Sequence, residues 1–539
     1  MTHRRRDFLK LLGAGSGVIA LRPDWLRANP SDAVSIDNGR QVFVDDFLIS
    51  DTTLTRTFHK PRLHEASPVL KPETPLEMNN GYCPVACPFH EGVFYDPKDR
   101  LFKMWYHAGW FDGVAYAYSE DGIRWKRPNL DIEPGTNRVL PRRDPFQRDG
   151  GGVWLDQETD DPSQRFKMFM FFRERAAGYR YGELYAPQAP TVSQGGRVYT
   201  SRDGIHWSER AATGPCGDNT SFFYNPYRRT WFYSIRTSDR RGRVRSYREC
   251  ADFVQGARWS ERDIVLFAAA DDKDAPDPVL GYKTQLYHVD AVAYESLMLG
   301  VYLIHKGPPN EICEKGGFPK ICDITLAYSR DGLRWERPDR APFLASSQQP
   351  GTWNRGYLHS AGGVCTIVGD ELYFYFGAWS GISPKLGSHM YAGGSTGLAV
   401  LRRDGFASLG AGISSGHVIT RTVRSRGKYL FVNAAAARGE LRAELLRNDG
   451  SVMEPFSLRN CIGIRRDATC QQVSWKGGKD FSSLAGESVR LRFHLTNSEL
   501  FAFWVSPDAS GASHGYVAAG GPGFVGPKDT IGSRRNLRA

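Results

Sequence analysis

The sequence is organised around a seven-residue phrase, Ser-x-Asp-Gly-x-x-Trp, that occurs three times. The copies are Ser119–Trp125, Ser201–Trp207 and Ser329–Trp335. Each follows a short aromatic-rich stretch that is typical of a strand. Asp-Gly after a strand indicates a tight turn, because glycine accepts positive φ and aspartate bonds its own backbone. A hairpin repeated at intervals of tens of residues predicts a propeller or a solenoid.

The repeat extends beyond these three copies. The gap between Trp207 and Trp335 is wide enough for two units and holds a degraded copy over 244–261. A worn fifth copy follows at Leu398–Phe406. Five such units, each of about four strands, predict a five-bladed β-propeller, a ring that leaves no long edge strand exposed.

After about residue 420 the pattern changes. Segments 429–432, 440–446 and 489–494 alternate apolar and polar residues, and Asn448-Asp-Gly450 marks a hairpin turn. This favours an antiparallel β-sandwich. With 57 Gly and 31 Pro punctuating short aromatic strands, the whole chain is expected to be all-β.

The N-terminal residues are expected to form a signal sequence for export. Arg5-Arg6-Asp7-Phe8-Leu9-Lys10 precedes the apolar stretch Leu11–Leu21, which resembles a twin-arginine signal. An amphipathic N-terminal helix is the alternative. The apolar stretch is too short to span a membrane. We therefore expect a periplasmic or extracellular protein without a membrane span in its mature form.

These observations divide the 539 residues into five parts. We expect a signal peptide at 1–28, an N-terminal strand (Gln41–Ile49) and Pro-rich approach within 29–75, the propeller at 76–420, the sandwich at 421–508 and a loose Gly-rich tail at 509–539. The N-terminal strand is expected to help close the ring.

Composition excludes several classes of partner. The net charge is +11, but the basic residues beyond the signal are scattered, which disfavours a nucleic-acid-binding patch. The nine cysteines contain no C-x-x-C pair, and the 13 histidines are dispersed without an H-x-x-x-H motif. We therefore expect no metal site and no cofactor.

The first strand of each unit ends in an acidic or amide turn residue, and we aligned the units on those residues. Counting back seven residues gives Asp149, Asp218 and His288, and counting back five gives Glu91 and Asp290. Positions seven and five share one strand face. In a propeller these first strands begin near the central axis, so the side chains are expected to converge on one funnel.

The strand–turn–aromatic-strand unit with these hairpins resembles the five-bladed glycosidases of glycoside hydrolase families 32 and 43. Residues 40–505 resemble most closely a family of uncharacterised bacterial proteins similar to family 32, through Val42–Ile49, Phe102–Tyr106 and Gly439–Leu446. The resemblance implies a carbohydrate substrate. The first unit departs from family 32, because Met78–Gly81 lacks the Asp of the expected nucleophile motif.

Arg148-Asp149-Gly resembles the R-D-P motif of family 32, and Asp218 falls where that family has its acid, although the expected Glu-Cys pair is absent. Glu77 and Glu91 are the two substitutes considered for the missing nucleophile. The catalytic candidates are Asp149, Asp218, Asp290 and Glu91. The candidates for substrate binding are Arg148, His288, His359, Trp105, Trp110 and Trp379.

Glycoside hydrolysis needs two carboxyl groups on either side of the scissile bond. The sequence therefore favours an exported glycoside hydrolase that acts on an oligo- or polysaccharide. A non-catalytic glycan-binding propeller is the alternative, because the nucleophile motif is missing. A propeller scaffold for protein partners is a second alternative, and it predicts an apolar face without an acidic funnel.

Overall fold

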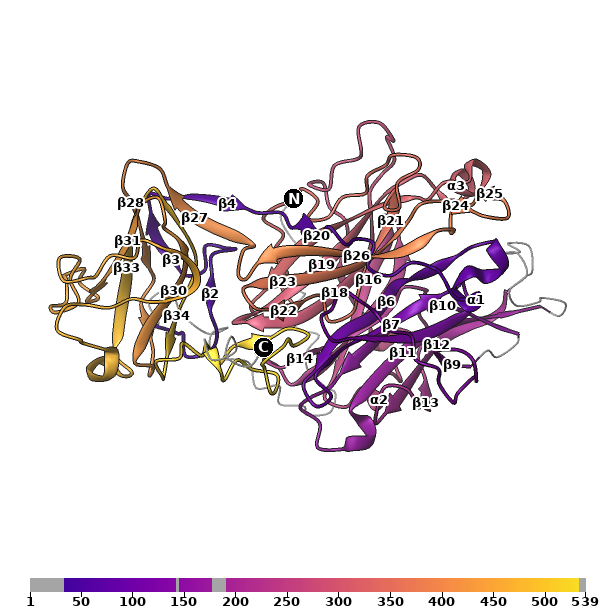
Figure 1. Cartoon of the computed structure of the whole chain (residues 1–539), viewed down its shortest axis with the longest axis horizontal. Helices are drawn as coiled ribbons and strands as arrows, with labels where there is room; N and C mark the ends of the chain where they lie inside the picture. The colour runs from indigo at the N-terminus through magenta and orange to yellow at the C-terminus, as the bar shows by residue number, and fades with distance from the viewer. Residues whose placement is uncertain (1–32, 142–144, 177–190, 533–539) are drawn as a thin grey trace, which may run out of the picture.

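The computed structural model describes residues 33–141, 145–176 and 191–532, which are mostly strands and the turns between them (Figure 1). This confirms the all-β class. The helical elements there are short: α1 (Pro75–Met78), α2 (Phe253–Gly256), α3 (Asn310–Gly316) and the 3-10 turns η3 (Asn79–Gly81), η4 (Pro162–Gln164), η5 (Glu261–Asp263) and η6 (Phe481–Leu484). No helix in these ranges has the length and apolar character needed to cross a membrane.

Most strands between residues 85 and 402 form five successive antiparallel groups. The first two are β6 (Val85–Asp96), β7 (Leu101–Ala108), β8 (Gly113–Ser119) and β9 (Arg138–Leu140), then β10 (Phe146–Leu155), β11 (Phe166–Arg175), β12 (Thr191–Ser201) and β13 (Ser208–Ala212). The third is β14 (Ser221–Asn225), β15 (Thr230–Asp239), β16 (Gly242–Cys250) and β17 (Val265–Ala268).

The fourth group is β18 (Gln285–Glu295), β19 (Leu297–Gly307) and β20 (Ile321–Ser329). The fifth is β21 (Gly356–Ser360), β22 (Thr366–Val368), β23 (Glu371–Trp379) and β26 (Gly394–Arg402), with the short β5 (Arg62–Leu63) paired to β26. A separate two-stranded sheet, β24 (Ile382–Ser383) and β25 (Gly387–Ser388), lies between β23 and β26 in the chain.

These groups form a closed ring, mostly through their first strands. β6 contacts β10, β10 contacts β14 and β14 contacts β18, while β21 contacts β6 and β20, the third strand of the fourth group. The first and fifth groups also join into one sheet, because β26 pairs in parallel with β6. The first strands therefore bring side chains from all the groups to a shared interior, where buried polar atoms need partners from neighbouring groups.

The three copies of the repeated phrase connect the first, second and fourth groups to the group that precedes each in the ring. The copies follow β8, β12 and β20, and in each the serine Oγ accepts from the glycine N–H while the aspartate accepts from the next two N–H groups. The turn then receives a bond from a neighbouring group: Trp105 donates to Gly204 O (2.7 Å), Tyr375 to Gly122 O (2.7 Å) and Asn225 to Asp331 O (2.9 Å). The phrase thus has a structural role, because its turn is hydrogen-bonded to a neighbouring group of strands.

A second unit consists of two sheets, drawn at the left of Figure 1. Phe43, Phe493 and Phe503 pack between them in one hydrophobic core. One sheet is β1 (Val34–Ser35), β3 (Ile49–Thr52), β28 (Gly416–Thr420), β29 (Val423–Arg424), β31 (Glu440–Leu446) and β33 (Ser488–Thr496). The other is β2 (Gln41–Val42), β4 (Thr55–Phe58), β27 (Ala407–Ala411), β30 (Tyr429–Ala435), β32 (Asp467–Gln472) and β34 (Ser498–Ser506).

The strand pairings cut across the expected division of the chain. The N-terminal strand does not close the ring, because β2 pairs with β34 and β3 pairs with β28 in the second unit. β27 and β28 precede residue 421, yet both belong to the second unit. Two facing sheets are needed to bury an apolar core, and these segments supply part of them.

The segment 509–532 is packed, contrary to the expected loose tail. β35 (Tyr516–Val517) pairs with β18 and completes the fourth group as a four-stranded sheet. Val517 and Asp529 are fully buried. Residues 533–539 lie outside the described ranges.

A network of buried charges joins the ring, the second unit and the C-terminal segment. Arg40 contacts Asp404 (2.8 Å), and Arg403 contacts Glu295 (2.8 Å) and Asp529 (3.1 Å). All five side chains have at most 1% of their surface exposed. Buried charges persist only when they are paired, so these five residues fix how the segments meet.

The turn contact predicts a strong effect of Gly204→Ala. Gly204 has a φ of +81°, and an added Cβ would lie 2.5 Å from Cζ2 of the buried Trp105. We expect the free energy of unfolding to fall by about 2–4 kcal/mol, from backbone strain plus steric overlap. Chemical denaturation measures it.

Gly135→Ala is the matched control, because Gly135 has a similar φ of +84° and no heavy atom within 4 Å of the added Cβ. It should cost only the strain of the backbone, about 1 kcal/mol. Equal losses in the two variants would show that the turn does not depend on its close approach to Trp105.

Candidate functional site

A bulge in β6 sets the position of His90. The pairing of β6 with β7 shifts register between Cys87 and Gly92, and His90 has a φ of +77°. A bulge breaks the alternation of side chains between the two faces of a strand. His90 and the next residue, Glu91, are both fully buried, and the rest of β6 is buried as well.

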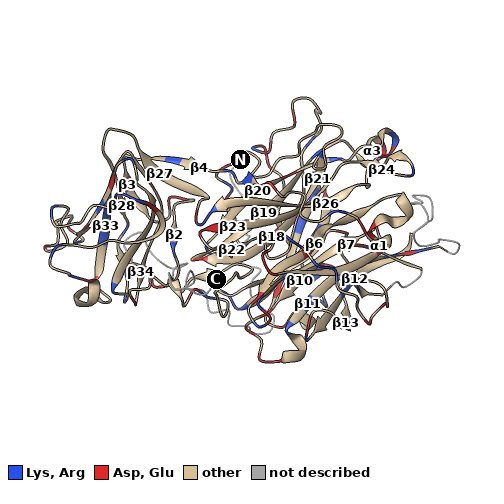
Figure 2. Cartoon of the chain, viewed as in Figure 1, with Lys and Arg blue, Asp and Glu red and all other residues tan. Residues whose placement is uncertain are grey.

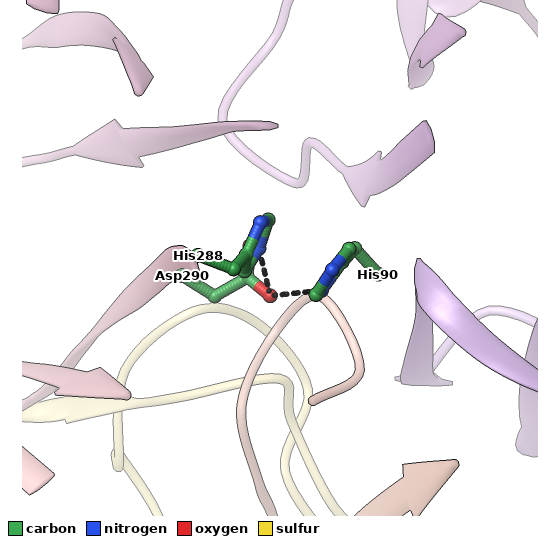
Figure 3. A group of neighbouring side chains, drawn as sticks. All are labelled: His90, His288 and Asp290. Atoms are coloured by element: carbon green, nitrogen blue, oxygen red, sulfur yellow. Dashed lines mark ion pairs between the residues drawn. The ribbon is translucent and has the colours of Figure 1, made fainter. Parts of the chain in front are cut away.

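His90 belongs to a buried set that we call the histidine cluster: His90, His288, Asp290 and His359, from β6, β18 and β21. Figure 3 shows His90 and His288 beside one oxygen of Asp290. That oxygen, Oδ2, lies 3.7 Å from His90 Nδ1 and 3.0 Å from His288 Nε2, and accepts from Ser360 Oγ (2.8 Å). The rings of His90 and His288 stack at 3.2 Å, and His359 Nδ1 lies 2.8 Å from His90 Nε2.

Asn219 contacts the ring nitrogens of His90 and His288 that face away from Asp290. It lies just before β14 with a φ of +58°. Its backbone oxygen accepts from Arg245 Nη1 (2.7 Å) and lies 2.9 Å from His288 Nδ1, while its Oδ1 lies 3.1 Å from His90 Nε2. Burial lowers the pKa of His288 to about 3, so its imidazole is neutral.

Asp149 and Asp218, which we call the acidic pair, meet on one guanidinium. Arg173 Nη2 lies 2.6 Å from Asp149 Oδ2 and 2.5 Å from Asp218 Oδ2, so these two oxygens are at most about 5 Å apart. Arg236 Nη1 lies 3.0 Å from the other oxygen of Asp218. Asp218 is 21% exposed and Asp149 only 6%, so solvent reaches the pair from the side of Asp218.

The two carboxyl groups of the acidic pair differ in pKa. Burial raises the pKa of Asp149 more than the charge of Arg173 lowers it, and the neighbouring Asp218 raises it further. Desolvation also opposes ionisation of Asp218, but the charges of Arg236 and Arg173 outweigh it and lower the pKa of that group. Asp149 is the carboxyl that holds its proton to higher pH.

Glu91 lies in a third environment. Its Oε1 is 3.6 Å from His107 Nδ1, and its Oε2 accepts from the N–H of Phe89. Burial opposes ionisation, but contact with His107 and the charge of Arg148 lower the pKa of Glu91. Glu77, the other substitute considered for the nucleophile, instead caps α1 through Thr74 and accepts from Tyr106 and Arg127.

The three tryptophans expected to bind substrate have different settings. Trp379 packs on His359 (5.4 Å between ring centroids), and Trp110 stacks on Tyr391 (4.2 Å, 9° between planes). Trp105 has no exposed surface and packs between the first and second groups. Trp379 likewise has no exposed surface. The ring and the N–H of Trp105 are used in packing, and its expected role in substrate binding stays a prediction.

Several of the expected site residues thus belong to two neighbouring sets, the acidic pair and the histidine cluster. Asp149 and Asp218 share one contact, whereas Asp290 lies with His288 and His359 in the histidine cluster. Asp218 and Asn219 are consecutive, which links the acidic pair to the cluster. Sequence analysis missed five residues that build the site: His90, His107, Arg173, Asn219 and Ser360.

The expected absence of a metal site stays a prediction, although the structure brings candidate ligands together. Histidines that are dispersed along the chain come together here, and one ligand atom each from His90, His288 and Asp290 lie within 4.8 Å of one another. Sequence spacing cannot reveal a set assembled from two strands far apart in the chain, β6 and β18. The position of His90, next to a carboxylate candidate, was the available signal.

No protein-family model and no curated protein matches the chain. Solved structures that are similar include an N-acetylgalactosamine deacetylase from F. plautii (14% identity, 70% of this chain and 97% of that chain, TM-score 0.39). An exo-β-1,3-galactanase from Phanerochaete chrysosporium is also similar (10% identity, 80% of this chain and 99% of that chain, TM-score 0.36). So is a thermostable family-43 glycoside hydrolase (12% identity, 59% of this chain and 92% of that chain, TM-score 0.37). At these identities and scores the likeness does not identify what this chain does.

The bridging contact predicts that Arg173→Met destabilises the protein most at neutral pH. Without the guanidinium, two carboxylates face each other, and the pKa of each rises in the folded state. We expect a loss of about 2–3 kcal/mol in the free energy of unfolding at pH 7, less than for a fully buried pair because Arg173 is partly exposed. The loss should shrink as the pH falls and the carboxyls become protonated. Denaturation at several pH values measures this.

Arg197→Met is the control, because Arg197 pairs with Glu209 on the surface of the same sheet. Such a pair contributes about 0–1 kcal/mol. A loss in Arg173→Met that does not vary with pH would rule out its electrostatic origin.

Proposed function

We propose that this protein is an exported carbohydrate-active enzyme that hydrolyses glycosidic bonds with the acidic pair. The observation that carries the proposal is the placement of two carboxyl groups with oppositely shifted pKa values on one partly exposed site. Glycosidases need one carboxyl that retains its proton and one that is ionised, and different environments produce that difference.

The roles follow from the two environments. Asp149, with its raised pKa, acts as the general acid and protonates the leaving glycosidic oxygen. Asp218, which is ionised, attacks the anomeric carbon and forms a glycosyl-enzyme ester. Asp149, now a carboxylate, then removes a proton from water as that water hydrolyses the ester.

The spacing favours this two-step reaction. Retaining glycosidases hold their carboxyls about 5–5.5 Å apart, whereas inverting enzymes need about 6.5–9.5 Å to admit a water. The limit of about 5 Å set by the contacts with Arg173 suits the shorter distance. Substrate must displace the guanidinium from between the two carboxyls for the reaction to occur.

We further propose that the ring is a five-bladed β-propeller and that the second unit is a β-sandwich. The closed circle of contacts between successive groups supports the first assignment, and the shared core of two sheets supports the second. In such a ring the acidic pair lies on neighbouring blades, because Asp149 is in β10 and Asp218 directly precedes β14.

A glycan-binding protein without hydrolytic activity is the second candidate. The position of Arg173 favours it, because the guanidinium fills the space between the carboxyls where the scissile bond would lie. A protein of this kind would bind a glycan and release no sugar. Binding and cleavage measured on the same panel of glycans separate the two functions.

Hydrolysis should depend on both members of the acidic pair. Asp149→Asn and Asp218→Asn are each expected to lower the rate by about 10²-fold or more, because each removes an acid–base or nucleophilic step. The double variant should be less than additive, since the residues act as a unit. Release of reducing sugar from a glycan panel measures the rate.

Asp272→Asn is the control, because Asp272 is exposed and lies in a loop. It should leave the rate unchanged. Near-wild-type turnover in both single variants would remove the acidic pair from the chemistry.

Export by the twin-arginine route is part of the proposal and rests on the sequence alone, since Arg5 and Arg6 lie outside the described ranges. The double variant Arg5→Lys/Arg6→Lys should keep the precursor in the cytoplasm, because the receptor distinguishes guanidinium from ammonium groups. Cell fractionation and immunoblotting measure the distribution. Unchanged export of the double variant would contradict the route.

A further inference from the structure

Three buried nitrogens of the histidine cluster have no hydrogen-bond partner within the described part of the chain. One is Nε2 of His359. The other two are Nδ1 of His90 and Nε2 of His288, both fully shielded from solvent. Each lies close to Oδ2 of Asp290, at 3.7 Å and 3.0 Å, but neither forms a hydrogen bond with it. Leaving such polar atoms unpaired in the interior costs free energy, so the arrangement calls for a ligand.

The opposite nitrogen of each ring has a partner. Nδ1 of His288 donates to the backbone oxygen of Asn219 at 2.9 Å, because a carbonyl can only accept. Nε2 of His90 lies 3.1 Å from Oδ1 of Asn219 and 2.8 Å from Nδ1 of His359, and we assign its proton to the bond with the Asn219 oxygen. With these tautomers each ring presents a lone pair on the side of Asp290.

Two lone pairs and a carboxylate oxygen thus face one small space. Atoms with this charge distribution repel one another unless a cation lies between them. We propose that His90, His288 and Asp290 bind a divalent transition-metal ion of the zinc type. Neutral imidazole together with carboxylate is a ligand set that such ions accept.

The distances suit an ion of this size. Zinc lies about 2.0–2.2 Å from nitrogen and oxygen ligands, so two ligand atoms can be at most about 4.4 Å apart. The separations of 3.7 Å and 3.0 Å from Asp290 Oδ2 are within that limit. The rings of His90 and His288 are 14° from parallel, so one must rotate for both lone pairs to point at the ion.

The surroundings resemble the outer shell of a metal site. Histidine ligands usually donate their second N–H to a carbonyl or carboxylate, and ligating carboxylates are themselves hydrogen-bonded. Asn219 supplies both acceptors for the rings, and Ser360 donates to Asp290 at 2.8 Å. With three protein ligands, a fourth position remains for water or another small ligand.

A proton shared with Asp290 is the competing explanation for the close approach. A protonated Nε2 of His288 would then need an N–H that points at the carboxylate, and the geometry provides no such bond. The two explanations differ in a measurable way, because only the first predicts metal bound in a fixed ratio.

The test uses the full chain, stripped with a chelator and then incubated with zinc chloride and passed through a desalting column. Elemental analysis should find about one zinc per chain in the wild type. His288→Gln and Asp290→Asn should each lower the bound zinc by about 10-fold or more, as loss of one of three ligands does.

His305→Gln is the matched control. His305 is buried on β19, and neither of its ring nitrogens has a hydrogen-bond partner in the described ranges, but it lies outside the cluster. His206→Gln controls for surface binding, because His206 contacts Asp131 and Asp203 in an exposed position. Both controls should keep the zinc of the wild type.

Cobalt binding to the wild type keeps the inference testable even where a variant fails to fold. Cobalt in the proposed site should give visible absorption bands that zinc abolishes by competition. Failure of the wild type to retain zinc, absence of the cobalt bands, or an equal loss of zinc in His305→Gln would each overturn the site. Asp149→Asn should retain the ion, which separates this inference from the proposed hydrolysis.

Discussion

The five buried charges of the network that includes Arg40 and Arg403 can all be paired only when the segments that carry them are in their native positions. Each charge is shielded from water, so each needs its partner in place. Those partners come from the N-terminal segment, the fourth group, the link after β26 and the C-terminal segment. The ring and the second unit therefore have one arrangement that satisfies the network, and a displaced segment would leave a charge unpaired in the interior.

Buried polar groups at the centre of the ring also need partners, and there they form candidate functional sites instead of holding segments together. Each group contributes a strand whose polar side chains find partners within their own group and on other groups. Asn219 meets this need for two histidines, and Arg173 meets it for two carboxylates. Where pairing is complete the residues are structural. Where it is incomplete, as in the histidine cluster, unpaired nitrogen atoms are available to bind a ligand.

The sequence predicted what depends on local pattern and missed what depends on distant partners. The Asp-Gly turns are local, so their number and places were predicted. Asp149 and Asp218 were found because each lies at a fixed distance from the end of its unit's first strand. His90 was missed because a bulge shifts its register, and Arg173 because a long side chain reaches across from a second strand. The boundaries failed because β1–β4 and β35 pair with strands far away in the chain.

The pairing of β35 with β18 has a consequence for the order of assembly. β35 follows β18 at a long distance along the chain, so this neighbour of β18 is synthesised much later than β18 itself. Until then part of one side of β18 is an open strand edge, which can pair with other chains. A polypeptide that stops before β35 would keep that edge exposed and be prone to association. The pairing of β35 therefore protects β18 only after the segment that holds β35 has been synthesised.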